Sequence, residues 1–240
     1  MTPHDASTDP RSEWDEYWSA SSPTQRVYER IAKFYRDRII GPALIHWIKK
    51  VHEPGARLLH AGCGSGGVDV EAHDYARITA LDFSAEGVRT YGRIHPGFTH
   101  LTRADLFALP FAPGSFDGVF NLGVMEHFTE DEILVALREM RRVLVPGGHV
   151  ILFWPPEWGL SVNVLRVAKV VLSRLQRKTV SFHPPEINRV RSRQQCEKWL
   201  EECGFTLEHY SFGPRDVFTH QIIVARAAMY SSLDSRGEHT

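Results

Sequence analysis

The stretch that decides the fold is ARLLHAGCGSGG, which covers residues 56–67. Its apolar first half ends in glycine, as is typical of a buried parallel strand. Gly62, Gly64 and Gly66 follow, and glycines permit a tight turn and the close approach of a ligand to the backbone. The run also fits GxGxxG through Gly67. The loop alone therefore leaves a dinucleotide site and a plain strand-to-helix turn open as alternatives.

Strands and helices alternate through the rest of the chain. Apolar runs predict strands at 56–62, 77–83, 98–106, 116–124, 149–155, 206–212 and 218–227. Periodic segments predict helices between Glu13 and Lys50, interrupted at Gly41-Pro42, and at 68–76, 84–94, 130–144 and 191–204, with a turn at 145–148. This order is typical of a Rossmann-like α/β fold, a parallel sheet with helices on both faces. The short link between the last two strands predicts an antiparallel hairpin at one edge.

The 240 residues are enough for a single α/β domain with additions to it. Residues 1–12, rich in Pro, Ser, Thr and Asp, predict a disordered tail. We expect one domain at 13–229, with a helical cap at 13–52 and an insertion at 156–191, followed by a flexible tail at 230–240.

The composition is that of an ordinary globular protein, with 42% hydrophobic and 24% charged residues. A net charge of −1 gives no general argument for binding nucleic acid or a membrane. Cys63, Cys196 and Cys203 form no CxxC pair, and the histidines form no HExxH motif, so we expect neither a disulfide framework nor a metal. Because the sequence has neither a signal-peptide pattern nor a long apolar run, we predict a cytoplasmic protein.

A carboxylate closes the second predicted strand. Asp82 lies 20 residues after Gly62, where an acid can accept hydrogen bonds from both hydroxyls of a ribose. The alternative is that Asp82 caps the next helix, but Ser84 suits that position better. We therefore favour a ribose-binding role.

The later segments carry a resemblance to a known family. In order, they are DLFALPF (105–111), SFD (115–117), EHF (126–128) and LVPGG (144–148). With the glycine loop and Asp82, they resemble the class I S-adenosylmethionine (SAM)-dependent methyltransferases, especially the group of the ubiquinone and menaquinone enzymes. The resemblance covers roughly residues 56–155. It implies seven strands with the last antiparallel, a lid insertion after the fifth strand, SAM as cofactor, and a small-molecule methyl acceptor.

The resemblance also implies which residues bind the cofactor. The glycine loop would line the methionine and ribose part, Asp82 would hold the ribose, and Asp105 would accept from the adenine amine. The Leu106 backbone would lie beside the ring, and Asn121 would border the methionine end. The full predicted set is Gly62, Cys63, Gly64, Gly66, Asp82, Phe83, Ala104, Asp105, Leu106, Asn121 and Gly123.

One position departs from the family pattern. His60 stands where the family usually has Asp or Glu, an acid that helps to hold the ammonium group of the cofactor. We expect that contact to be weaker in this chain or to be taken over by another group.

Methyl transfer from a sulfonium is an in-line displacement, for which alignment and a dry site supply most of the acceleration. An oxygen acceptor also needs a base. His127, after the fourth strand, is the first candidate, although packing against the cofactor is an alternative role. His183, in the insertion, is the second candidate.

The insertion is basic. Between Trp158 and Gln195 there are eight Lys or Arg residues and one acid, and 163–178 is also amphipathic. Three interpretations stay open: a solvated lid face, a site for an anionic or lipid-like acceptor, and peripheral contact with an acidic membrane. The nucleic-acid signal is weak because no aromatic residues interleave with the basic ones.

Two other functions remain as alternatives. One is a non-catalytic module that binds SAM or a partner, and the other is a nicotinamide-dependent oxidoreductase. The second lacks a hydride-transfer motif such as Tyr-x-x-x-Lys and gives the DLFALPF and SFD segments no role. The sequence does not indicate the oligomeric state.

Overall fold

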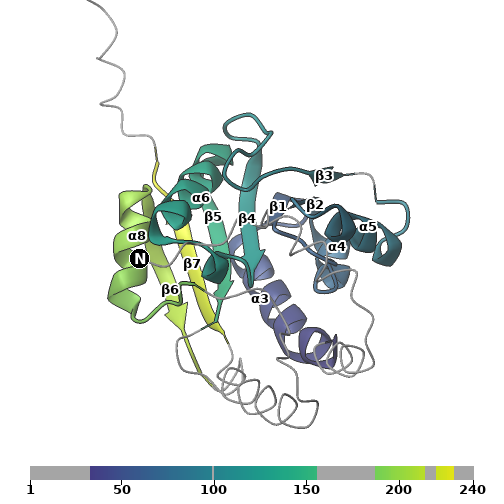
Figure 1. The fold of residues 1–240 in the computed structure, drawn as a ribbon, viewed down its shortest axis with the longest axis horizontal. Helices are drawn as coiled ribbons and strands as arrows, with labels where there is room; N and C mark the ends of the chain where they lie inside the picture. The colour runs from purple at the N-terminus through teal and green to yellow at the C-terminus, as the bar shows by residue number, and fades with distance from the viewer. Residues whose placement is uncertain (1–32, 99, 156–186, 214–219, 230–240) are drawn as a thin grey trace, which may run out of the picture.

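The computed structural model describes residues 33–98, 100–155, 187–213 and 220–229. Its seven strands are β1 (Arg57–Ala61), β2 (Arg77–Asp82), β3 (Leu101–Arg103), β4 (Phe116–Leu122), β5 (Leu144–Trp154), β6 (Phe205–Ser211) and β7 (Gln221–Ala227). They form one sheet in the order β3-β2-β1-β4-β5-β7-β6 (Figure 1). Strands β1 to β5 pair in parallel, whereas β7 is antiparallel to both β5 and β6. The predicted fold class is confirmed.

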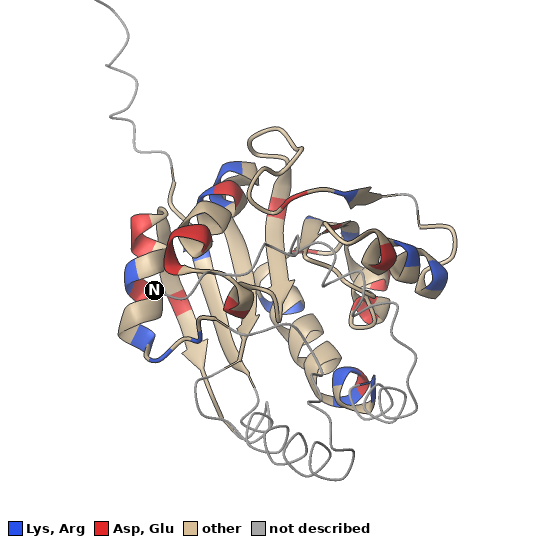
Figure 2. Ribbon diagram, in the orientation of Figure 1, with Lys and Arg blue, Asp and Glu red and all other residues tan. Residues whose placement is uncertain are grey.

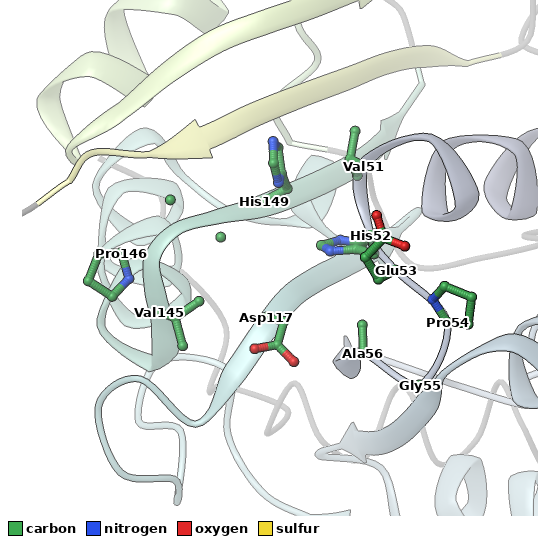
Figure 3. Close-up of a pocket in the computed structure, with 12 residues that line it drawn as sticks. Val51, His52, Glu53, Pro54, Gly55, Ala56, Asp117, Val145, Pro146 and His149 are labelled. Carbon is green, nitrogen blue, oxygen red and sulfur yellow. The ribbon is translucent and has the colours of Figure 1, made fainter.

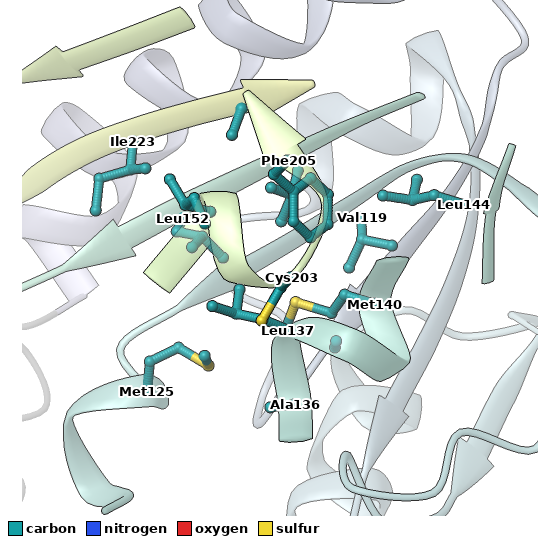
Figure 4. Close-up of a cluster of buried hydrophobic side chains, with 14 of the residues drawn as sticks. Val119, Met125, Ala136, Leu137, Met140, Leu144, Leu152, Cys203, Phe205 and Ile223 are labelled. Carbon is teal, nitrogen blue, oxygen red and sulfur yellow. The ribbon is translucent and has the colours of Figure 1, made fainter. Parts of the chain in front are cut away.

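Helices cover both faces of the sheet (Figure 1). The helical elements are η1 (Arg36–Ile40), α3 (Gly41–Val51), α4 (Val70–Tyr75), α5 (Ala85–Ile94), η2 (Met125–His127), α6 (Glu130–Val143) and α8 (Arg193–Glu202). Leu58 packs in the buried cluster with α3 and α4, whereas its neighbour Leu59 packs in the cluster with α6 and α8. Successive side chains of a strand point to opposite faces, so an apolar strand needs cover on both. Figure 4 shows the second cluster, around Leu137 and Phe205.

Polar side chains define where two of the predicted helices begin. The Ser84 hydroxyl accepts a hydrogen bond from the Gly87 amide at the start of α5. At α6 the bonding is reciprocal, because the Thr129 hydroxyl accepts from the Glu132 amide and the Glu132 carboxylate accepts from the Thr129 amide. These caps place the helix starts within one residue of the predicted bounds.

The helical cap continues through Gly41-Pro42, so the predicted interruption is wrong. The wider η1 turn, in which the Gly41 amide donates to the carbonyl of Arg36, runs directly into α3. Pro42 lies in the first turn of α3, where its fixed φ suits a helix and its missing N–H costs little. Proline is therefore accommodated within a continuous helical segment instead of ending it.

The predicted turn at 145–148 lies inside β5. Leu144 pairs with Phe116, and regular pairing with β4 resumes at His149 after a shift of register. Gly147 has a φ of 77°, a conformation that favours glycine. The chain bends at 145–148, as predicted. Because β5 pairs with β4 on both sides of the bend, the segment is a bulge within β5 and not a turn between two elements.

Several predicted segments lie outside the described residues. These are the tails at 1–12 and 230–240, residues 13–32 of the helical cap, and residues 156–186 of the insertion. On the described helices, acidic and basic side chains are interspersed (Figure 2). Among the residues that the structure describes, none of the helices is both long enough and apolar enough to cross a membrane.

Candidate functional site

The carboxyl ends of four neighbouring strands bring the predicted cofactor residues into one row. Asp105 follows β3, Asp82 ends β2, the glycine loop follows β1, and Asn121 lies near the end of β4. Backbone bonds connect these ends, since the Ala104 amide donates to the carbonyl of Asp82 at 3.0 Å. Strands lie about 4.8 Å apart, so the row from β3 to β4 spans about 14 Å. This length suits an extended nucleoside with an amino-acid tail.

The glycine loop needs its glycines for two physical reasons. Gly62, Gly64 and Gly66 all have positive φ, at 78°, 48° and 64°. A Cβ on Gly66 would also lie 2.1 Å from the ring of Tyr91, and one on Gly62 would lie 2.7 Å from Val124. The loop is therefore fixed by close packing beneath it as well as by backbone conformation.

Asp82 holds the loop from the side of β2. Its Oδ2 accepts a hydrogen bond from the Gly64 amide at 2.7 Å, and its Oδ1 accepts from the Ser84 amide at 2.8 Å. Burial raises the pKa of this carboxyl, although the two amides oppose that rise. Each carboxylate oxygen has a second lone pair, so these bonds leave acceptor capacity for a ligand. The buried Ser84 caps α5, as predicted.

The segment after β3 forms a tight turn around Asp105. Oδ1 of this half-buried side chain accepts from the Phe107 amide at 2.9 Å, and the adjacent Leu106 is buried. On the β2 side, the carbonyl of Phe83 accepts from Nε of Arg103 at 2.9 Å. The turn places the carboxylate at the outer end of the row.

The end of β4 is tied to the end of β1. Nδ2 of Asn121 donates to the carbonyl of Ala61, next to the glycine loop. Oδ1 of the same buried side chain has no hydrogen-bond partner among the described residues. Gly123, with a φ of 66°, turns the chain away from the strand, and its amide donates to the carbonyl of Phe153 at 3.0 Å.

Of the two predicted bases, the described residues include only His127. It lies in η2, with its Nε2 3.9 Å from Oε1 of the buried Glu126, and its own side chain is 9% exposed. The Glu126 carbonyl accepts from the amides of Ile187 and Asn188, the first described residues after the insertion. His183 lies outside the described residues. The burial of Glu126 was not anticipated from the sequence, where it stands as an ordinary loop acid.

A buried polar network beneath the glycine loop was also not predicted from the sequence. Nδ1 of His60 lies 2.8 Å from Oδ2 of Asp69, and both side chains are almost fully enclosed. The Tyr91 hydroxyl donates to the same carboxylate oxygen at 2.7 Å. The contacts come from β1, the loop before α4, and α5. Since no local spacing rule connects those segments, the sequence gives no signal for the network.

A hollow of about 450 Å³ lies at the opposite, amino-terminal edge of the sheet (Figure 3). His52, Asp117 and His149 line it. Burial, and then the nearby His149, lower the pKa of His52 to about 4. None of the predicted cofactor residues lines this hollow.

Comparison with known proteins agrees with the row of residues at the carboxyl edge. The family described as a methyltransferase domain matches residues 59–152, which include the glycine loop, Asp82, Asp105 and Asn121. The magnesium protoporphyrin IX methyltransferase of Synechocystis, solved with bound S-adenosylhomocysteine (SAH), has the same fold. Its TM-score is 0.62 at 16% sequence identity, covering 90% of this chain and 94% of that one.

Curated relatives are also methyltransferases. A malonyl-[acyl-carrier protein] O-methyltransferase of Methylococcus capsulatus is 30% identical over 75% of this chain and 62% of that protein. A 2-phytyl-1,4-naphtoquinone methyltransferase of Synechocystis is 29% identical over 75% of this chain and 86% of that protein. A probable tRNA methyltransferase 9B of Bos taurus is 29% identical over 55% of this chain, but the match spans only 29% of that protein. A second malonyl-[acyl-carrier protein] O-methyltransferase, from Enterobacter lignolyticus, is matched over 36% of its length. The chain therefore spans about a third of the length of the first relatives that it matches.

The fold, the row of residues and these matches agree on one class. Residues 59–152 are similar to the methyltransferase domain, and solved structures with the same fold hold bound SAH or SAM.

Proposed function

We propose that this protein transfers the methyl group of SAM to a small-molecule acceptor. The observation that carries the proposal is the row of Asp105, Asp82, the glycine loop and Asn121 along one edge of the sheet. Its length and its sequence of polar groups suit adenine, ribose and an amino-acid tail in that order.

Each group in the row has a chemical role in this proposal. Asp105 accepts from the adenine amine, and Asp82 accepts from the ribose hydroxyls through lone pairs that the Gly64 and Ser84 amides do not use. The glycine loop lets the tail approach the backbone, and the partnerless Oδ1 of Asn121 is an acceptor at its far end. SAM, when bound, would supply a methyl group on a positively charged sulfur.

For an acceptor that must lose a proton, we propose His127 as the base. It lies just beyond β4, and its Nε2 is 3.9 Å from Oε1 of the buried Glu126. His183 remains a second proposed base on sequence grounds. An anionic or lipid-like acceptor fits the basic insertion, and 163–178 is the segment proposed for contact with a membrane. We keep a cytoplasmic location as part of the same proposal.

The names of several relatives support a small-molecule acceptor. They include enzymes named for malonyl-[acyl-carrier protein], demethylmenaquinone and 2-phytyl-1,4-naphtoquinone. These acceptors differ widely, so the proposal names the class of acceptor and not one compound.

A thermal-shift comparison tests the cofactor assignment. We expect SAM and SAH to raise the melting temperature, and we expect NAD to leave it unchanged. Stabilisation by NAD alone would contradict the proposal in favour of the nicotinamide alternative. Turnover of labelled SAM is then measured with phenols, quinol precursors, amines and fatty acids. Binding of SAM without turnover of any acceptor in this panel would favour the non-catalytic module.

A further inference from the structure

His60 occupies a buried position at the carboxyl end of β1, two residues before the glycine loop. Only 2% of its surface is exposed, and its ring packs against Phe120 with centroids 4.4 Å apart. Nδ1 lies 2.8 Å from Oδ2 of Asp69, a residue with no exposed surface. A histidine and a carboxylate are thus enclosed together directly beneath the start of the loop.

The partners of Asp69 determine which nitrogen of His60 carries the proton. Oδ2 of Asp69 also accepts from the hydroxyl of Tyr91 at 2.7 Å. An ionised carboxylate can only accept, so Nδ1 of His60 must be the donor in their contact. In the neutral imidazole the lone pair then lies on Nε2, and no described residue makes a hydrogen bond to that nitrogen.

Two buried carboxylates, those of Asp69 and Asp82, lie close to the His60 imidazole. Oδ1 of Asp69 is buried and has no hydrogen-bond partner among the described residues. Buried polar groups in proteins are normally hydrogen-bonded, so this enclosed carboxylate can still accept from a further donor. Asp82, which is also buried, adds a second carboxylate nearby and raises the pKa of Cys63 together with Asp69, after burial itself. The surroundings of His60 therefore favour a bound cation.

The strand order indicates which part of the cofactor lies over His60. Asp105 and Asp82 assign the adenosine to the ends of β3 and β2, and the sheet continues β2-β1-β4. The amino-acid tail, with its ammonium group, then lies over the ends of β1 and β4. This step rests on the proposed function.

We propose that His60, kept in its Nδ1–H form by Asp69, accepts a hydrogen bond at Nε2 from the ammonium group of the cofactor. Asp69 is a positioning residue: its carboxylate fixes the tautomer of His60. It does not contact the ammonium group itself, because His60 lies between them. The pair thereby does the work of the acid that this position usually holds in the family.

Two ligands separate this role from a general structural one. SAH has the amino-acid tail, whereas 5′-methylthioadenosine has the same adenosine and sulfur without it. We expect His60→Phe, which keeps a flat ring against Phe120 but removes the acceptor, to weaken SAH binding about tenfold by calorimetry. We expect the affinity for 5′-methylthioadenosine to change by less than about twofold.

Asp69→Asn tests the tautomer. Its amide can donate to Nδ1 and shift the imidazole proton to Nε2, which then faces the ammonium as a donor. We expect the same selective loss of SAH binding. Tyr91→Phe is the matched control, because it removes the other bond to Asp69 but keeps the ring that packs under Gly66. It should leave the ratio of the two affinities within about twofold of the parent.

The possible outcomes are distinct. If His60→Phe and Asp69→Asn weaken the binding of both ligands equally, the network only supports the loop and the inference is overturned. Unchanged SAH binding in the two variants would also overturn it. If His60→Phe does not fold in thermal-melting measurements, His60→Leu takes its place with the same expectation. A parent protein that binds neither ligand contradicts the proposed function itself, which is a separate result.

Discussion

The two edges of the sheet contain similar side chains and use them differently. At the amino-terminal edge, Asp117 accepts three hydrogen bonds from Arg57, and His149 lies 3.2 Å from Glu208. At the carboxyl edge, Asp69 and Asn121 each keep a buried oxygen without a partner among the described residues. Histidine and carboxylate alone therefore do not identify a binding site in this fold. Buried polar atoms left without partners distinguish the carboxyl edge.

Backbone conformation separates the edges in the same way. Three glycines with positive φ follow one another at the carboxyl edge, and a Cβ on Gly66 would overlap the Tyr91 ring. The hollow in Figure 3, by contrast, contains one such glycine from each of two separate segments, Gly55 and Gly147. A Cβ on Gly55 would meet nothing within 4 Å. Glycine is needed at Gly66 for conformation and space, and at Gly55 for conformation alone.

The largest effect is expected from Gly66→Ala. The positive φ and the overlap with Tyr91 should together lower the free energy of unfolding by about 4 kcal/mol and abolish SAH binding. Denaturant unfolding measures the first effect, and calorimetry measures the second. Gly55→Ala is the control, for which we expect a loss of about 1 kcal/mol and unchanged SAH affinity. Equal losses in the two variants would remove the contrast between the edges.

Asp82→Ala comes next. We expect a loss of about 3 kcal/mol in SAH binding, or roughly a hundredfold in Kd, because the two charge-assisted bonds proposed between Asp82 and the ribose would be absent. Some of the loss comes from the Gly64 amide, which also loses its acceptor. Asp82→Asn keeps one acceptor oxygen and should show an intermediate loss. If Asp82→Ala binds SAH as tightly as the parent does, the ribose assignment is wrong.

A pH effect of about 3 kcal/mol is expected at the other edge. The pKa of His52 is about 4 in the folded protein, below its ordinary value of 6.5, chiefly because of burial. Between these values the unfolded chain binds the proton more readily, so stability is complete above pH 6.5 and decreases as the pH falls toward 4. Denaturant unfolding of the parent and of His52→Gln measures this decrease, which should be smaller in the variant. Parallel pH profiles would contradict it.

The smallest effect is expected from Arg57→Ala. The hydrogen bond from Arg57 lowers the pKa of Asp117, so the pair stabilises the fold at neutral pH and this contribution disappears on acidification. Both side chains are partly exposed, which limits the effect to less than about 1 kcal/mol. SAH binding should not change. Weakened SAH binding in this variant would show that the two edges are coupled.

The carboxyl edge was largely predictable from sequence because its determinants are local. The glycine loop, Asp82 and Asp105 each follow a recognisable strand, and parallel strands necessarily bring their carboxyl ends together. The unpredicted features depend on contacts between distant segments. Asp69 reaches His60 only after the loop folds back, and β3 covers only Leu101–Arg103 of the predicted strand.

The segment 156–186 is bounded by a structural clasp. The Trp154 indole donates to the carbonyl of Asn188, and the Asn188 amide donates to the carbonyl of Glu126. The two boundaries of the segment are thus fastened to each other beside η2, whatever sequence lies between them. Because closing a longer loop costs little additional entropy, about 0.6 kcal/mol for each doubling of length, segments of other lengths can be grafted between these anchors.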